Sequence, residues 1–176
     1  MQNTTTSPPR TMLEAFKSLP EGTLVQLINN QLIMAAAPLD IHQFVLGQIH
    51  YELFGIVINN NLGQVRVAPY DVFLSSKNVF QPDISFIANE NLHKIQADGL
   101  HGAPDLVIEL LSPSTSKYDL DEKKDVYERY GVKEYFIIEP ATKTVDHYWL
   151  VNGEYSKQPS TAGNINSKLL NCQITF

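Results

Sequence analysis

The chain of 176 residues has one cysteine, Cys172, and fewer basic than acidic side chains. A single cysteine excludes an internal disulfide and fits a reducing compartment. With 13 lysines and arginines against 19 acidic residues, the formal net charge is -6, which argues against a general nucleic-acid coat protein. It does not exclude an enzyme that contacts DNA, because a bound metal ion supplies positive charge locally.

The sequence also lacks any long apolar run. No stretch approaches the roughly 18 apolar residues of a membrane helix. The polar start MQNTTTSPPR contains no apolar segment of a signal peptide, and no internal repeat or linker is visible. We therefore expect a cytoplasmic protein without membrane contact, with a flexible tail over residues 1–10 and a single domain over residues 11–176.

The first third of the chain predicts a short helix, a β-hairpin and a long helix. Thr11 opens the short helix, and Asn29-Asn30 form the turn of the hairpin LVQLINNQLIMAA. Residues 38–59 have a helical pattern with Asp40 as its expected N-cap. The apolar residues that carry this pattern are spaced by three and four, namely Ile41, Phe44, Val45, Ile49, Leu53 and Ile56.

The rest of the chain predicts strands around one further helix. QVRVAPYDVFL and FQPDISFIA have strand composition, and a polar loop over residues 90–103 follows them. A buried strand over residues 105–111 then leads, after a break at Ser112-Pro113-Ser114-Thr115, into a helix that Gly131 ends. The last expected strands are KEYFIIEP, TVDHYWLV and a pair near EYSKQ and LLNCQITF. This order indicates an α/β (α+β) fold with a mixed central sheet flanked by helices.

Two charged residues in this strand and helix occupy positions that are usually apolar. Side-chain alternation places Glu109 on the same strand face as Val107, and a helical wheel from Leu120 places Lys123 with Val126 and Tyr127 on the buried side. Its neighbour Lys124 falls on the outer side. Unpaired buried charge is strongly disfavoured, so these residues need partners. The alternative for Lys123 is that its stem lies on the edge of the core with its amine in water.

Asp83, after Pro82 in an earlier apolar strand, completes a possible site. By itself it has the ordinary explanation of an aspartate at a turn or strand start. Together, two carboxylates on neighbouring strands suit a hard divalent cation such as Mg²⁺, for which Mn²⁺ is a substitute. A lysine beside them would position or activate water and stabilise developing negative charge. Asp83, Glu109 and Lys123 therefore suit phosphodiester hydrolysis.

These residues resemble the PD-(D/E)XK nuclease pattern, with one departure, because Leu111 stands at the usual lysine position. The whole chain resembles the Uma-two family of restriction endonucleases, in which the lysine is moved to the following helix. The resemblance covers residues 11–176 and is most specific over residues 104–140. The matching segments are APYDVFL, PDISFI, PDLVIELLSPST, the D-x-x-x-K-x-x-x-Y spacing of Asp119, Lys123 and Tyr127, and GVKEYFIIEP.

The resemblance implies a restriction endonuclease-like fold and a metal-dependent nuclease site at Asp83, Glu109 and Lys123. Asp83 and Glu109 would bind the metal, and DNA would be the substrate. Cutting two strands needs two sites, so a homodimer is expected. A further departure is Gln26, which stands where the family's hairpin usually has an acid.

Four residues are possible accessories to this site. They are Gln26 and three others that each have two interpretations. His42 is either a proton carrier or DNA contact, or a partly exposed residue of a helix's first turn. Asp71 is either a second layer behind the metal ligands or a bulge residue, and Asp119 either caps its helix or orients Lys123. His93, His101 and His147 have no spacing typical of a metal site, and Tyr127 and Tyr130 are expected to pack in the core.

Three hypotheses follow. The first is a Mg²⁺-dependent DNA endonuclease. The second is a non-catalytic nucleic-acid-binding or assembly module that retains the nuclease fold, which Gln26 and the acidic net charge favour. The third is a metal-dependent hydrolase of smaller phosphate esters. We prefer the first, because it accounts for Asp83, Glu109 and Lys123 together.

Overall fold

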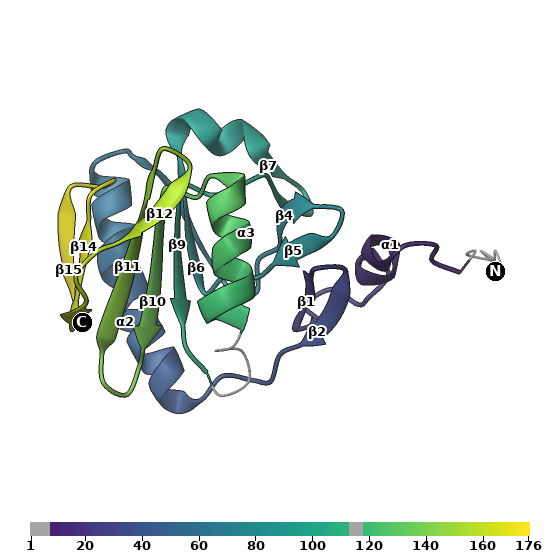
Figure 1. Cartoon of the computed structure of the whole chain (residues 1–176), viewed down its shortest axis with the longest axis horizontal. Coiled ribbons are helices and arrows are strands. Elements are labelled where there is room, and N and C mark those ends of the chain that lie inside the picture. Colours follow the sequence, from purple (N-terminus) through teal and green to yellow (C-terminus); the bar gives the residue numbers. More distant parts are fainter. Residues whose placement is uncertain (1–7, 113–117) are drawn as a thin grey trace.

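The computed structural model describes residues 8–112 and 118–176 (Figure 1). Residues 1–7 of the expected tail and the Pro113-Ser114-Thr115 part of the expected break lie outside the described residues. The single-domain prediction for residues 11–176 stays a prediction. The α-helices are α1 (Met12–Lys17), α2 (Asp40–Asn59) and α3 (Lys123–Tyr130), with a 3-10 helix over Asn89–Lys94 and a π-helical turn over Tyr118–Glu122.

Short strands make up most of the remaining chain. In order they are β1 (Val25–Ile28), β2 (Gln31–Met34), β3 (Gly63–Val67), β4 (Val72–Ser75), β5 (Asn78–Phe80), β6 (Ile84–Ala88), β7 (Ile95–Gln96), β8 (Gly99–His101), β9 (Leu106–Leu110), β10 (Glu134–Glu139), β11 (Thr144–Val151), β12 (Glu154–Lys157), β13 (Thr161–Ala162), β14 (Asn164–Ser167) and β15 (Cys172–Thr175).

The described strands form a central mixed sheet and two smaller sheets. The central sheet has the order β12-β11-β10-β9-β6-β3, with β13 paired to β11. Within it β9 and β10 run parallel, joined by the crossover that contains α3, and β6 pairs antiparallel with β9. The second sheet has the order β2-β1-β5-β4-β8-β7, and β14 pairs with β15. The mixed α+β architecture predicted from the sequence is confirmed.

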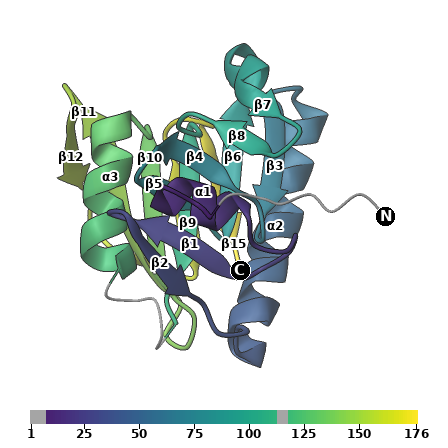
Figure 2. The same cartoon turned by 90° about the vertical axis from the view of Figure 1, so that its right-hand side faces the viewer.

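Helices cover the two faces of the central sheet. Figure 2 shows α2 on one side of the strands and α3 on the other. Alternation divides β9 accordingly: Leu106, Ile108 and Leu110 pack in the core that contains α2 residues, whereas Val107 packs in the core that contains α3 residues. Glu109 belongs by this alternation to the α3 side. The central strand therefore points its one acid toward the helix that carries Lys123.

The first hairpin forms as predicted. Asn29 and Asn30 connect β1 and β2 with φ angles of 47° and 67°. Asparagine tolerates this left-handed region better than most residues, and two successive residues with positive φ match the twist of a two-residue hairpin. The hairpin joins β5 through β1, which places Gln26 of β1 near the segment that leads into β6.

The prediction for α2 was right in extent and wrong at its start. Leu39, not Asp40, is the N-cap, and no side chain caps the first turn. Of the residues whose spacing predicted the helix, Ile41 and Phe44 are exposed, whereas His42 is buried. The helix has apolar residues on more than one side, so their spacing alone did not identify the side that faces the sheet.

The helix that carries Lys123 also differs from its prediction. Residues 118–122 form a π-helical turn, and only residues 123–130 are α-helical, with Gly131 in the left-handed conformation that ends the helix. A wheel at 100° per residue does not hold through a π turn. Leu120, expected inward, and Tyr130, expected to pack in the core, are each 39% exposed, while Asp119 is buried. Lys123, Val126 and Tyr127 are buried as predicted.

Other differences lie in short elements. QVRVAPYDVFL is two strands in different sheets, divided by the cis Ala68-Pro69 bond. The expected polar loop over residues 90–103 contains β7 and β8, and β15 pairs with β14 instead of with the EYSKQ strand. Of the helices in the described residues, none has the length and apolar character needed to cross a membrane.

Candidate active site

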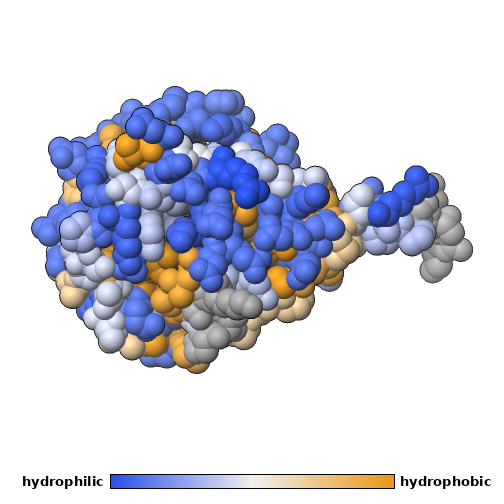
Figure 3. All heavy atoms as spheres, viewed as in Figure 1, coloured by the Kyte–Doolittle hydropathy of each residue, from blue (hydrophilic) through white to orange (hydrophobic). Residues whose placement is uncertain are grey.

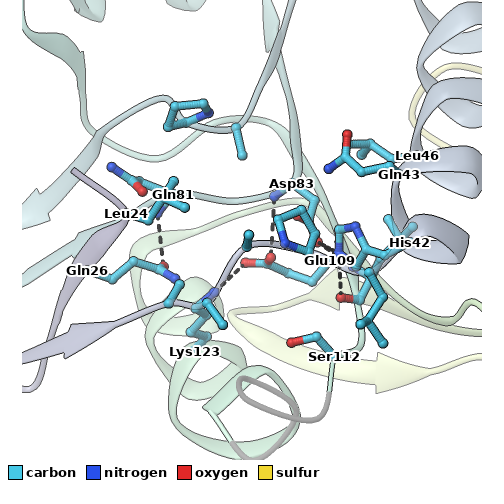
Figure 4. Close-up of a pocket in the computed structure, with 18 residues that line it drawn as sticks. Leu24, Gln26, His42, Gln43, Leu46, Gln81, Asp83, Glu109, Ser112 and Lys123 are labelled. Atoms are coloured by element: carbon cyan, nitrogen blue, oxygen red, sulfur yellow. Dashed lines mark hydrogen bonds and ion pairs between the residues drawn. The ribbon is translucent and has the colours of Figure 1, made fainter. Parts of the chain in front are cut away.

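A cavity of about 490 Å³ opens between the first hairpin, the start of α2 and the ends of the central strands (Figure 4). One wall consists of Ala35, Ala36, Ala37 and Pro38, which connect β2 to α2. The polar and charged residues that line the cavity come from segments far apart in the sequence, namely Gln26, His42, Gln43, Gln81, Asp83, Glu109, Ser112 and Lys123. The structure thus brings the three predicted site residues together around one space.

Glu109 lies at the centre of this group. Its Oε1 accepts hydrogen bonds from Lys123 Nζ at 3.0 Å and from the Tyr127 hydroxyl at 2.9 Å. The side chain is almost completely buried. Burial raises the pKa of Glu109 to about 8; the Lys123 charge opposes this rise, and Asp119 and Asp83 add to it. The charged neighbours of Glu109 therefore act in opposite directions on this pKa: Lys123 favours the ionised carboxylate, whereas Asp119 and Asp83 disfavour it.

Lys123 lies between two acids. Its Nζ is 3.0 Å from Glu109 Oε1 and 2.8 Å from Asp119 Oδ1. Burial alone lowers the pKa of Lys123, but the negative charges of Asp119 and Glu109 outweigh it and raise the pKa above the ordinary value. Lys123 is thus a buried, protonated ammonium. The snorkelling alternative does not hold, and Asp119 pairs with Lys123.

Asp83 and Glu109 are linked across the β6–β9 pair. Asp83 precedes β6, and its Oδ2 accepts a hydrogen bond of 2.7 Å from the Leu110 amide. In the reverse direction, the Asp83 amide lies 3.4 Å from Glu109 Oε2, a long hydrogen bond. Each carboxylate is therefore positioned by the backbone of the other's strand. Asp83 is a structural bridge between strands as well as a residue of the cavity wall.

His42 reaches the same group from the first turn of α2. Its Nε2 lies 3.2 Å from the Leu110 carbonyl oxygen and 3.3 Å from Asp83 Oδ2. Since a carbonyl oxygen only accepts hydrogen bonds, Nε2 carries the proton. Burial lowers the pKa of His42, but the hydrogen bond and charge of Asp83, with help from the Leu110 carbonyl and Glu109, raise it overall. His42 is a buried part of the site, not an exposed helix-start residue.

Gln26 and Asp71 are joined through Gln81. Gln26 Oε1 accepts a hydrogen bond of 2.9 Å from the backbone amide of Gln81. Asp71 Oδ1 accepts one of 2.8 Å from the side-chain Nε2 of the same glutamine. Gln26 lines the cavity, whereas Asp71 is not among its lining residues. Burial raises the pKa of Asp71. Asp71 thus lies one residue behind the cavity and contacts its lining through Gln81.

Sequence reasoning missed three contributions to this site. Tyr127, expected only to pack, donates to Glu109, and its place four residues after Lys123 on the same helix face was the available signal. The Leu110 backbone and Gln81 gave no signal, because a backbone amide and a lone glutamine are not distinctive in sequence.

The oxygen atoms of Asp83 and Glu109 suit a hard divalent cation. Lys123 and Tyr127 bind Glu109 Oε1, while Oε2 lies on the Asp83 side with only the 3.4 Å amide contact among the described residues. No group of three or more histidine, cysteine, aspartate or glutamate side chains with metal-site geometry occurs in the part of the chain that is described. Mg²⁺ keeps several waters and is commonly held by one or two carboxylates, so two acids are a fitting set.

Comparisons with known proteins show the fold and the family of the chain. The chain is similar over 85% of its length, at 19% identity and a TM-score of 0.70, to 84% of a crystal structure described as a putative nuclease belonging to DUF820 from Anabaena variabilis ATCC 29413. At this identity the likeness shows the fold. No curated protein matches the chain. The family model Uma2, described as "Putative restriction endonuclease", matches residues 13–173. With nearly its whole length matched and a restriction endonuclease-like fold, the chain belongs to the Uma2 family.

Proposed function

We propose that this protein is a metal-dependent DNA endonuclease that hydrolyses phosphodiester bonds in its Asp83–Glu109–Lys123 cavity. One observation carries the proposal: a fully buried lysine donates to a buried glutamate that lines the same cavity as a second acid. Buried charge without a task is costly, and replacement by apolar residues is often neutral or stabilising. Family membership supports the class of reaction.

Asp83 and Glu109 would hold Mg²⁺, with Mn²⁺ as a substitute. When bound there, the ion supplies Lewis-acid polarisation of a phosphate and lowers the pKa of a bound water. The chain's own contribution is to position the acids: the Leu110 amide fixes Asp83 Oδ2, and Tyr127 with Lys123 fixes Glu109 Oε1.

Lys123 acts as a cation in this proposal, not as a general base. Its pKa is raised by Asp119 and Glu109, so the amine keeps its proton at neutral pH. A protonated ammonium beside the cavity would orient a water molecule and stabilise the negative charge that develops on phosphate oxygens. Asp119 is the positioning residue for Lys123, at 2.8 Å from its Nζ.

The remaining residues have supporting roles. His42 holds its Nε2 proton toward Asp83 and the Leu110 carbonyl, so it positions the first acid. Asp71 would orient Gln81, which in turn binds Gln26. We also propose a cytoplasmic location, in line with the single cysteine, and a homodimer, since cutting both strands of DNA needs two sites.

Cleavage assays with matched lysine variants test this function. The purified protein should nick or cut supercoiled, linear or single-stranded DNA with Mg²⁺ or Mn²⁺ and stop on chelation by EDTA. Lys123→Ala should abolish cleavage, whereas Lys124→Ala, one residue along the same helix, should leave it near wild type. Absence of metal-dependent cleavage of every DNA form, or cleavage unchanged in Lys123→Ala, would contradict the proposal. Cleavage of nucleotides alone would instead indicate a hydrolase of small phosphate esters.

A second function is favoured by Gln26 and by the small positive charge around the cavity. Among the described lining residues, Lys123 is the one lysine or arginine, and it is already paired with two acids. A non-catalytic binding or assembly module would need no further positive charge at this cavity. Calorimetric titration with Mn²⁺ separates the two: heat of binding that disappears in Asp83→Asn favours the nuclease, and no binding favours the module.

A further inference from the structure

Helix α2 has a second apolar face that points away from the sheet. Of the 11 large hydrophobic side chains that are exposed in the described residues, six lie on α2 or at its N-cap. Each of the six is between 44% and 77% exposed. Isolated exposed hydrophobic residues are normal, but a group on one element marks an interaction surface. We call this group the outer face, and its members are Leu39, Ile41, Phe44, Tyr51, Phe54 and Ile58.

The outer face lies opposite the buried face of the same helix. At 100° per residue, the outer-face residues within α2 fall in an arc of about 140°. The buried residues fall in an arc of about 120° whose centre is about 170° away. Gln43 and His50 lie at one border of the outer face and Glu52 at the other, while Asp40 and Gln48 lie within its arc and Asn59 at its edge. A helix that covers a sheet normally has one apolar face, so the second one needs a partner.

The surface on the α3 side of the molecule differs from the outer face in hydropathy. Figure 3 shows that hydrophilic residues dominate the surface on the side of α3, and Figures 1 and 2 show α2 on the other side of the central sheet. Helix α2 contains no lysine or arginine; its only acidic residues are Asp40 and Glu52. A surface without cations does not bind phosphates, so nucleic acid is not the partner of the outer face. The partner is an apolar protein surface.

The order of large and small residues makes the outer face complementary to itself. Turning a second α2 antiparallel about the midpoint between Ile49 and His50 places Phe44 opposite Gly55 of the partner subunit and Ile41 opposite Ile58 of the partner subunit. A Cβ built on Gly55 meets nothing within 4 Å, so the space above this glycine is open. A two-fold axis repeats each contact, as symmetric dimers require. We propose that α2 pairs antiparallel with α2 of a second copy and forms the interface of a homodimer.

The area available is sufficient for a specific dimer. A large side chain has a surface of about 150–250 Å², so six side chains exposed by about half offer about 600 Å² per copy. The pair would bury about 1,200 Å², the lower end of the range for stable interfaces. A helix of 20 residues spans about 30 Å, long enough for four turns of contact. The interface does not depend on catalysis, so it can fail or hold separately from the proposed function.

Sedimentation of the full chain tests the dimer. Wild type should change from monomer to dimer as its concentration rises. Phe44→Glu should raise the dimer dissociation constant at least tenfold, because a charge would be buried in the interface. The matched control is Val151→Glu, which places the same charge on a large residue that is 44% exposed on β11, outside the outer face. It should leave the dissociation constant unchanged, and thermal melting confirms that both variants fold.

Cross-linking tests the antiparallel order. In a Cys172→Ser background, the double variant Ile41→Cys with Ile58→Cys should form a disulfide-linked dimer on oxidation. Neither single variant should do so, because two copies of position 41 would lie about 25 Å apart along the helices. In a parallel pair, each single variant would cross-link efficiently.

Three results would overturn the proposal. Wild type that stays monomeric at every concentration excludes the dimer. A dimer whose dissociation constant is unchanged in Phe44→Glu places the interface elsewhere. Cross-linking of either single variant, or none in the double variant while the dimer persists, excludes the antiparallel pairing of α2.

Discussion

Two buried glutamates on neighbouring parallel strands differ in what surrounds them. Glu109 on β9 and Glu134 on β10 are both almost inaccessible to solvent. Alternation points Glu109 to the α3 side of the central sheet. Glu134 shares the opposite side with Phe136 and Ile138. The same residue type, equally buried in the same sheet, therefore has two different environments.

The partners of Glu134 tie the C-terminal hairpin to the sheet. Its Oε2 accepts a hydrogen bond from the Ser167 hydroxyl, and its Oε1 accepts one of 2.7 Å from the Lys168 amide. His147 Nε2 lies 3.2 Å from the same Oε1, as a close contact without hydrogen-bond alignment. Ser167 and Lys168 thus give each Glu134 oxygen one hydrogen bond from the C-terminal hairpin, so Glu134 has the features of a structural residue.

The partners of Glu109 are shared and in excess. Lys123 pairs with both Glu109 and Asp119, and Asp83 is the second carboxylate that lines the cavity beside Glu109. Asp83 in turn has His42 as its neighbour. The comparison shows that burial of an acid does not by itself identify a site. What distinguishes Glu109 is the cavity beside it and a lysine that it shares with a second acid.

The largest expected effect separates the two glutamates by activity. Glu109→Gln should lower DNA cleavage by about a thousandfold, because a neutral amide removes the charge that would hold the metal and pair with Lys123. Glu134→Gln should stay within about twofold of wild type, since the carboxamide keeps an acceptor for the Lys168 amide. Single-turnover cleavage rates with saturating Mg²⁺ measure both. Equal losses in the two variants would remove the functional distinction.

Stability should show the opposite order. Glu134→Leu leaves the Ser167 hydroxyl and the Lys168 amide without their acceptor, which should cost about 2–4 kcal/mol in the free energy of unfolding. Glu109→Leu leaves the Tyr127 hydroxyl without its acceptor, but it also removes one of the two acids that share Lys123, which keeps Asp119, so the net loss should be smaller, about 1 kcal/mol. Denaturant unfolding without metal measures both free energies. A larger loss for Glu109→Leu would show that the cavity acid is structural.

The pH dependence of stability gives a smaller test. The pKa of Glu109 is about 8 in the folded protein against an ordinary value of 4.5. A raised folded pKa means that folding favours the protonated form, so its contribution is full below about 4.5 and declines as pH rises through about 8. Wild type should lose stability relative to Glu109→Gln over this interval and no further above it. The Glu134→Leu variant retains Glu109, so its stability should decline over the same pH interval as that of wild type. Unfolding without metal at several pH values measures it.

Much of the site was predictable from the sequence, because local patterns encode it. A strand alternates, so Glu109 had to share a face with Val107, and the spacing from Lys123 to Tyr127 put both on one side of a helix. Asp83 stands just before an apolar run, which suggested a strand next to the one that carries Glu109. The pairing of β6 with β9 brings Asp83 to Glu109. Whether these residues act in catalysis stays a prediction.

Other features were not predictable, because they depend on geometry that no local pattern carries. Within the π-helical turn over residues 118–122, Leu120 lies outward against the wheel, whereas Asp119 is buried on the side of Lys123. His42 reaches Asp83 from a separate helix, 41 residues earlier in the chain. The apolar residues of α2 lie on two opposite faces, so periodicity did not show which one meets the sheet.

The smallest effect concerns Gln26 of β1, which lines the cavity. Gln26→Glu would place a third carboxylate on the cavity wall near Asp83 and Glu109, while its oxygen still accepts from the Gln81 amide. Added negative charge should tighten Mn²⁺ binding and raise cleavage by up to about tenfold, at a cost of about 1 kcal/mol in stability without metal.

Gln43→Glu is the matched control, because it makes the same change in the same cavity from α2. Calorimetric Mn²⁺ titrations of both variants decide the outcome. If only Gln26→Glu tightens binding, the β1 position belongs to the metal environment. Equal tightening in both would mean that any added acid suffices through its long-range field. No change in either would leave Asp83 and Glu109 as the whole acidic set, and the contrast with Glu134 would then rest on those two residues and Lys123 alone.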